Sequence, residues 1–173
     1  MDLPAATPAI APTAWSTVGW ASSSAKWSSL IATFAGRLEG LLEATDTFAV
    51  PCCLRHPPIE PTDGSIQWFL TKLAMQHRDI MARDNSLTES VVKHMIILVE
   101  KILLGNTYIV LSSSNVKRIV LVAMMISAKV LDDFAYDNRH WAFIGGININ
   151  ELNILEVEVL DLVGWRVGCS SSV

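Results

Sequence analysis

The most apolar segment of the 173-residue chain reads Val116-Lys117-Arg118-Ile119-Val120-Leu121-Val122-Ala123-Met124-Met125-Ile126. When this segment is wound as an α-helix with about 3.6 residues per turn, apolar side chains cover nearly its whole circumference. A helix of that kind is enclosed by other elements of the fold rather than by water. The segment therefore predicts the central helix of a helical domain, and the pattern ends near Asp132 and Asp133.

The composition limits the kinds of protein that this chain can be. Hydrophobic residues make up 51% of the sequence and charged residues 17%, with a formal net charge of −4. A disordered chain combines low hydrophobicity with high charge, so disorder over most of the length is excluded. Nucleic-acid-binding proteins usually carry an excess of basic residues, and the acidic balance argues against that class.

Neither a membrane span nor a secretory signal is expected. The longest uncharged apolar run, Ile119–Ala128, would rise about 15 Å as a helix, half the thickness of a bilayer core. Asp2 and the prolines among the first twelve residues are incompatible with a signal peptide. Cys52, Cys53 and Cys169 show neither zinc-binding spacing nor an even disulfide framework, which favours an intracellular, reducing compartment.

Apolar residues recur at the i, i+3, i+4 spacing of amphipathic helices before and after the central segment. A first helix is expected within residues 25–45, after an Ala/Pro/Ser/Thr-rich arm over 1–24 that we expect to be flexible. Residues 46–62 are too rich in proline for a helix and are expected to form a linker. A helical domain then covers 63–168, followed by a tail over 169–173, and the predicted fold class is all-α.

Polar residues predict where several of these helices begin. Asp63 is expected to cap the second helix, and Ser86 or Thr88 to open the third. Asn148 and Glu151, three residues apart, have the spacing of a capping box at the start of the last helix.

Three charged residues, Lys129, Glu156 and Glu100, lie on or beside the apolar stripes of three different helices. A buried or half-buried charge is costly unless it is paired. One interpretation is that Lys129 pairs with Glu156, with Glu100 nearby. The alternative is that all three lie at the edges of the stripes and extend to water, as charged side chains usually do.

No motif supports catalysis, a cofactor or a bound metal, and none of these is expected. The four histidines lack metal-binding spacing, and the serines do not occur in a nucleophile motif. Gly145-Gly146 precedes a helix and could hold an anion, although a tight turn is the commoner role of such a pair. Asp132-Asp133 could be a carboxylate pair, although an acidic helix end is commonplace. These residues alone predict a helical interaction module.

Short motifs follow one another through the second half of the chain: Ala128-Lys129, Asp132-Asp133, Tyr136-Asp137-Asn138, Gly145-Gly146-Ile147 and Glu151-Leu152-Asn153-Ile154-Leu155-Glu156. This ordered series resembles the cyclin box of the P/U-type, phosphate-signalling cyclins. The resemblance implies a single five-helix cyclin box over 63–168, with the helix at 25–45 as its N-terminal flanking helix. Lys72, in the first helix of the box, stands where that family usually has an arginine.

The resemblance also implies a function. Cyclins bind and activate a cyclin-dependent protein kinase without performing chemistry themselves. Lys129 and Glu156 match the lysine and glutamate that face the regulatory helix of the kinase, and Glu100 would support Lys72 within the box. The carboxylates that would be offered to arginines of the kinase activation segment are those of Asp132, Asp133 and Asp137.

Two other functions fit an all-α chain. A cyclin-like adaptor in transcription would need a basic face, and the scattered Lys and Arg residues speak against one. A small helical enzyme would need a nucleophile beside a base, and the sequence shows no such arrangement. For the kinase regulator, the processes implied are the cell cycle or nutrient and phosphate signalling.

Overall fold

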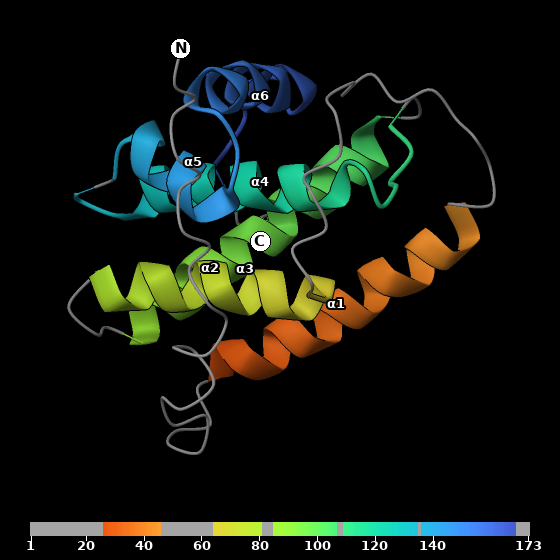
Figure 1. Ribbon diagram of the computed structural model, residues 1–173, viewed down its shortest axis with the longest axis horizontal. Coiled ribbons are helices and arrows are strands. Elements are labelled where there is room, and N and C mark those ends of the chain that lie inside the picture. Colours follow the sequence, from red (N-terminus) through yellow and green to blue (C-terminus); the bar gives the residue numbers. More distant parts are fainter. Residues whose placement is uncertain (1–25, 46–63, 81–84, 107–108, 135, 169–173) are drawn as a thin grey trace, which may run out of the picture.

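The computed structural model describes residues 26–45, 64–80, 85–106, 109–134 and 136–168, and these form six helices and no strand (Figure 1). The helices are α1 (Lys26–Thr45), α2 (Ile66–Ile80), α3 (Asn85–Gly105), α4 (Val116–Leu131), α5 (Asn138–Gly145) and α6 (Ile149–Leu162). The predicted all-α class is confirmed. The expected flexible arm, proline-rich linker and tail lie outside the described residues.

The centre of the fold is α4, which crosses the middle of the molecule in Figure 1. Twelve of its sixteen residues are buried. It packs against α2, α3, α5 and α6, so neighbours cover nearly every side of it. The prediction of a central helix from residues 116–126 is therefore confirmed.

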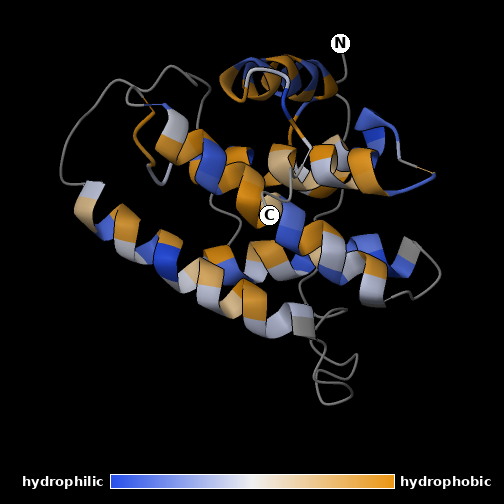
Figure 2. Cartoon of the chain, turned by 180° about the vertical axis from the view of Figure 1, so that it is seen from behind, coloured by the Kyte–Doolittle hydropathy of each residue, from blue (hydrophilic) through white to orange (hydrophobic). Residues whose placement is uncertain are grey.

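The first helix, α1, lies along α2 and α3. Its buried side chains recur every three or four residues, and Figure 2 shows apolar and hydrophilic residues alternating along it. The large ones are Trp27, Ile31, Phe34 and Leu38, and Ala35 is buried beside them. Leu41 continues the spacing but is 47% exposed, whereas the next residue, Leu42, packs against the core.

The helix starts differ slightly from expectation. The Ser65 hydroxyl accepts a hydrogen bond from the backbone N–H of Trp68 at 3.2 Å, which makes Ser65 a cap of α2. The expected cap, Asp63, lies outside the described residues. The third helix, α3, begins at Asn85, one residue before the expected Ser86.

Gly145 and Gly146 form the tight turn that follows α5. Gly146 has a φ of 70° and a ψ of 30°, a left-handed conformation that favours glycine. A Cβ atom on Gly145 would lie 2.2 Å from Leu121 Cδ2, so with any larger residue here either the leucine side chain or α5 would have to move. These contacts account for both glycines and favour the tight-turn interpretation over anion binding.

The start of α6 bears out half of the expected capping box. The Asn148 side chain accepts from the backbone N–H of Asn150 at 2.8 Å. Glu151 does not reach back to Asn148, and instead its Oε1 accepts from Arg118 Nε at 2.7 Å. Because the Arg118 guanidinium is buried, it needs a carboxylate partner, and the resulting ion pair joins α6 to α4.

Candidate partner-binding site

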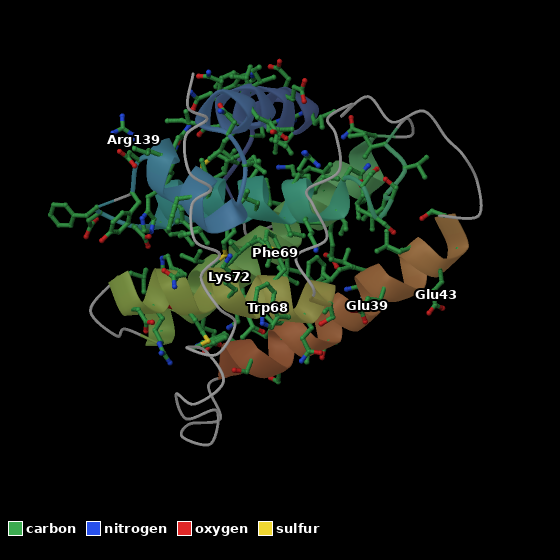
Figure 3. The ribbon with its side chains drawn as sticks, viewed as in Figure 1. Glu39, Glu43, Trp68, Phe69, Lys72 and Arg139 are labelled. Atoms are coloured by element: carbon green, nitrogen blue, oxygen red, sulfur yellow. The ribbon has the colours of Figure 1, made fainter. Side chains whose placement is uncertain are left out.

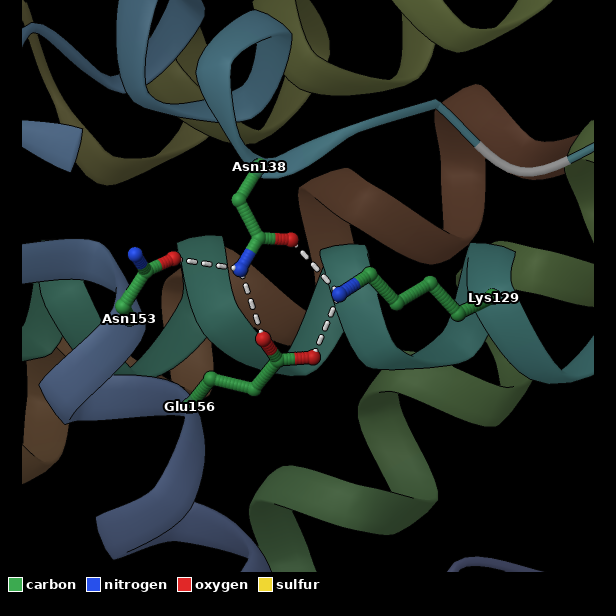
Figure 4. Close-up of polar contacts among 4 residues, drawn as sticks. All are labelled: Lys129, Asn138, Asn153 and Glu156. Carbon is green, nitrogen blue, oxygen red and sulfur yellow. Dashed lines mark hydrogen bonds and ion pairs between the residues drawn. The ribbon is translucent and has the colours of Figure 1, made fainter.

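Lys129, Asn138 and Glu156 meet where three helices converge (Figure 4). Lys129 is in the last turn of α4, Asn138 is the first residue of α5, and Glu156 is in the middle of α6. Lys129 Nζ lies 2.5 Å from Glu156 Oε1 and 2.6 Å from Asn138 Oδ1. The interpretation that Lys129 pairs with Glu156 is confirmed.

This ion pair is partly exposed, with 31% of the Lys129 side chain and 18% of the Glu156 side chain open to solvent. Neither charge extends separately into water, so the alternative interpretation is wrong for these two residues. Hydrogen bonds between charged groups are about twice as strong as neutral ones, and partial burial reduces their screening. The pair is therefore held in place while remaining accessible to a partner.

Exposed apolar side chains directly follow Lys129 on α4 and flank Glu156 on α6. They are Val130, Leu131, Ile154 and Val157, between 38% and 52% exposed. The partly exposed Lys129 and Glu156 can form hydrogen bonds with polar groups of another molecule, and exposed apolar side chains lie next to them in sequence on α4 and α6.

Glu100 lies elsewhere, so its expected position near the pair was wrong. Its Oε1 accepts from Arg37 Nη1 at 2.7 Å, which joins α3 to α1. It also makes no contact with Lys72, whose support it was expected to provide. The physical reason is that this side of α3 is covered by α1, where Arg37 supplies a guanidinium.

Lys72 binds the protein's own backbone. Its Nζ donates to the carbonyl oxygen of Ile144 at 2.8 Å, in the last turn of α5, and lies 5.6 Å from the centre of the Trp68 ring. Figure 3 shows Lys72 and Trp68 together on α2. Burial lowers the pKa of Lys72 below its ordinary value of 10.5. The contact with Ile144 joins α2 to α5.

The carboxylates after α4 have different surroundings. Asp133 is exposed. Asp132 is buried, with its Oδ2 2.8 Å from His77 Nε2, and is closed to arginines of another protein. Asp137 caps α5 by accepting from the backbone N–H of His140 at 3.0 Å. The carboxylate-pair interpretation of Asp132 and Asp133 is therefore wrong, because the two side chains have different surroundings.

His77 forms a buried hydrogen-bonded chain that joins α2, α3 and the end of α4. Its Nδ1 lies 3.1 Å from Thr88 Oγ1, while its Nε2 binds Asp132. The order of groups resembles an acid–base–nucleophile triad. However, the side chains of His77 and Asp132 are 2% and 1% exposed and Thr88 is buried, so a substrate has no access. This chain of groups is structural.

Sequence reasoning missed Asn138, His77 and His94 as residues with specific contacts. His94 Nε2 donates to the carbonyl oxygen of Val167 at 2.7 Å and so holds the segment that follows α6. Helical spacing alone does not identify such contacts, because they depend on how distant helices pack. Asn138 had one signal, its place in the Tyr136-Asp137-Asn138 motif.

In the ranges that the structure describes, no three His, Cys, Asp or Glu side chains are grouped so as to hold a metal ion. Among the same residues, every helix falls short of the length and apolar character that crossing a membrane requires.

The fold and the site define an all-α domain with a partly exposed ion pair at the junction of three helices. Residues 29–167 match the sequence model of the cyclin family, and the chain belongs to that family. The match begins inside α1 and ends in the segment held by His94. Cyclins are non-catalytic regulatory proteins, which agrees with the expectation that this chain performs no chemistry itself.

Individual relatives are plant cyclins of the U and P types. Cyclin-U4-2 of Arabidopsis thaliana is 37% identical over 62 residues, covering 36% of this chain and 29% of the relative. Cyclin-U1-1 of the same plant is 43% identical over 61 residues, 35% of this chain and 29% of that one. Cyclin-P1-1 of Oryza sativa is 39% identical over 62 residues, which cover 36% of this chain and 24% of the relative. The aligned part thus spans under a third of these relatives.

Proposed function

We propose that this chain is a regulatory subunit that binds and activates a cyclin-dependent protein kinase. The observation that carries the proposal is the Lys129–Glu156 pair, held together and partly exposed at the junction of α4, α5 and α6. The two residues match, in order and spacing, the cyclin-box lysine and glutamate that face the kinase's regulatory helix. Membership of the cyclin family supports the same function.

Activation would follow from selective binding to one state of the kinase. In an active kinase, the glutamate of the regulatory helix is paired with the ATP-binding lysine and the activation segment is ordered. A cyclin that binds only the state with this helix turned inward shifts the population toward it. Moving a 1:99 equilibrium to 99:1 takes a preference of about 10⁴-fold between the two states.

The expected partner-binding residues take two roles in this proposal. Lys129, Glu156 and exposed Asp133 contact the kinase, the last through arginines of the activation segment. Lys72 and Glu100 act from within the fold by supporting α5 and α1, because each already has an internal partner.

The test is co-purification of the chain with a cyclin-dependent kinase, followed by phosphorylation of histone by the complex. Lys129→Glu and Glu156→Lys are each expected to abolish co-purification and histone phosphorylation. Lys93→Glu is the matched control, since it reverses one charge of an ion pair with Glu89 on α3, away from the site. Unchanged binding by both site variants would show that the interface lies elsewhere.

We place this regulation in the cytoplasm or nucleus and in cell-cycle or phosphate-responsive signalling, as the family resemblance implies. Comparing histone phosphorylation by the immunopurified complex from phosphate-fed and phosphate-starved cells tests the second part. Equal activity in both samples, and at all cell-cycle stages, would remove both processes from the proposal.

A further inference from the structure

Asn138 joins both members of the ion pair through a single side chain, although it was not among the expected partner-binding residues. Its Oδ1 accepts from Lys129 Nζ at 2.6 Å, and its Nδ2 donates to Glu156 Oε2 at 2.7 Å (Figure 4). We infer that Asn138 is a positioning residue that sets Lys129 and Glu156 in the geometry required by a partner's peptide backbone. The inference rests on the proposed function for the identity of that partner.

A carboxamide is the group that fits this position. The lysine needs an acceptor and the glutamate needs a donor, and a carboxamide offers an acceptor oxygen and a donor nitrogen on the same carbon. The second amide proton of Asn138 goes to Asn153 Oδ1 at 2.7 Å, so both protons are used. The amide orientation follows from these contacts, because the reverse would direct the NH₂ group at the ammonium and the oxygen at the carboxylate.

The hydrogen-bonding capacity that remains matches a peptide backbone. Toward the described residues, Lys129 uses two of its three ammonium protons, and each oxygen of Glu156 accepts one hydrogen bond. A free N–H donor therefore lies beside free carboxylate lone pairs, complementary to the C=O and N–H groups of a peptide. Fixing these groups before binding reduces the side-chain entropy lost on association.

The fold keeps Asn138 itself in place. It is the first residue of α5, which Asp137 caps at its start and Gly146 ends with a left-handed turn. Trp141, one turn further along, is buried in the core. Because α5 is capped at both ends and Trp141 is buried in the core, Asn138 holds the pair from a regular helix rather than from a loop.

The first test needs only the isolated chain and reads the lysine directly. An ammonium group held by two acceptors exchanges its protons slowly enough to give a ¹H–¹⁵Nζ NMR signal in the cold. We expect this signal for Lys129 in the wild type and in Asn150→Ala, a control at an exposed position of α6 outside the network. In Asn138→Ala the exchange is expected to become about tenfold faster. Unchanged exchange would overturn the inference.

A second variant guards against loss of folding. Asn138→Asp keeps the shape of the side chain and suits the first turn of a helix. It replaces the Nδ2 donor, which lies 2.7 Å from Glu156 Oε2 in the wild type, with a carboxylate oxygen. The repulsion between the two carboxylates is expected to lower its Tm, so its circular dichroism spectrum in the cold is first compared with that of the wild type to show that it is folded. The Lys129–Glu156 geometry, followed by side-chain NMR under the same conditions, is then expected to change.

The second measurement is affinity for the cyclin-dependent kinase recovered with the wild-type chain. We expect about tenfold weaker binding for Asn138→Ala, a larger loss for Asn138→Asp, and no change for Asn150→Ala. Equal affinity of all variants would overturn the positioning role but leave the proposed function intact. Failure of the wild type to bind any kinase would overturn the proposed function, while the NMR result would still decide whether Asn138 positions the pair.

Discussion

At the scale of single residues, Lys129 and Glu100 show how the same sequence pattern leads to different contacts. Both are charges beside an apolar helix stripe. Lys129 reaches Glu156 on α6, whereas Glu100 reaches Arg37, 63 residues earlier in the chain. Lys129 is near the end of α4, where α5 and α6 converge, while Glu100 faces the side of α3 that α1 covers. The partner of each charge is thus decided by helix packing.

The buried contact between His77 and Asp132 gives a stability prediction. Asp132→Ala removes the acceptor 2.8 Å from His77 Nε2 and leaves a buried ring nitrogen unpaired. We expect the free energy of unfolding, measured by urea denaturation, to fall by about 1–3 kcal/mol. Asp133→Ala, at the exposed neighbouring position, should change it by less than about 0.5 kcal/mol. Equal losses for the two variants would contradict a structural role for Asp132.

Lys72 gives a prediction for the pH dependence of stability. Burial lowers its pKa in the folded chain below 10.5, so the folded chain releases this proton at lower pH than the unfolded chain does. Between the folded-state and unfolded-state pKa values of Lys72, the unfolded chain binds more protons than the folded chain. The contribution of Lys72 to the free energy of unfolding therefore rises with pH until the pH passes 10.5. This contribution is lost as the pH falls through the pKa of Lys72 in the folded chain.

The measurement is the unfolding free energy of the wild type minus that of Lys72→Met, determined by denaturation at a series of pH values. We expect this difference to increase as the pH rises toward 10.5. A difference that does not depend on pH would show that burial leaves the ionisation of Lys72 unchanged.

At the scale of elements, helix existence was predictable from the sequence, while helix partners were not. Apolar spacing predicted α4 as the central helix, and its burial agrees. The Lys129–Glu156 pair was anticipated because stripe position and the cyclin-box motifs both indicated it. Asn138 was missed because its role requires knowing that α5 begins between α4 and α6. Glu151 was misassigned because buried Arg118, 33 residues away, binds it in place of the helix start.

The contact between α5 and α4 gives a prediction about Gly145. Gly145→Ala would place a Cβ 2.2 Å from Leu121 Cδ2, so α5 must shift or the leucine must move. The expected loss is about 1–3 kcal/mol of unfolding free energy, measured by urea denaturation. Gly36→Ala on α1 is the control, since no atom lies within 4 Å of the added carbon. The control should be stabilised by about 0.5–1 kcal/mol, and a neutral Gly145→Ala would contradict the close approach.

At the scale of the whole molecule, the apolar composition divides between core and surface. The core accounts for much of it through α3, α4 and the inner faces of the other helices. The rest includes large exposed side chains, among them Leu104, Phe134, Phe143 and Trp165 at 62–86% exposure. Single exposed apolar side chains are ordinary on protein surfaces, and burial of any of these against a partner would be favourable.

This surface predicts that the chain is more stable in complex than alone. A kinase that binds only the folded chain, present at 100 times its Kd, should add about 2.7 kcal/mol to the unfolding free energy. The Tm of the chain, followed by labelled-chain fluorescence, is therefore expected to rise with kinase concentration. A constant Tm across the titration would contradict binding to the folded state.

The most direct test of the central claim, that Lys129 and Glu156 bind the kinase, is the affinity of the double charge exchange Lys129→Glu with Glu156→Lys. The exchange retains opposite charges at the two positions, where Lys129 Nζ lies 2.5 Å from Glu156 Oε1 in the wild type. It should therefore keep the fold and the Tm close to those of the wild type. Titration calorimetry against the kinase is expected to show binding more than about tenfold weaker, because the donor and acceptor offered to the partner have traded places. Wild-type affinity of the double variant would show that the pair only joins α4 to α6, and would contradict the account.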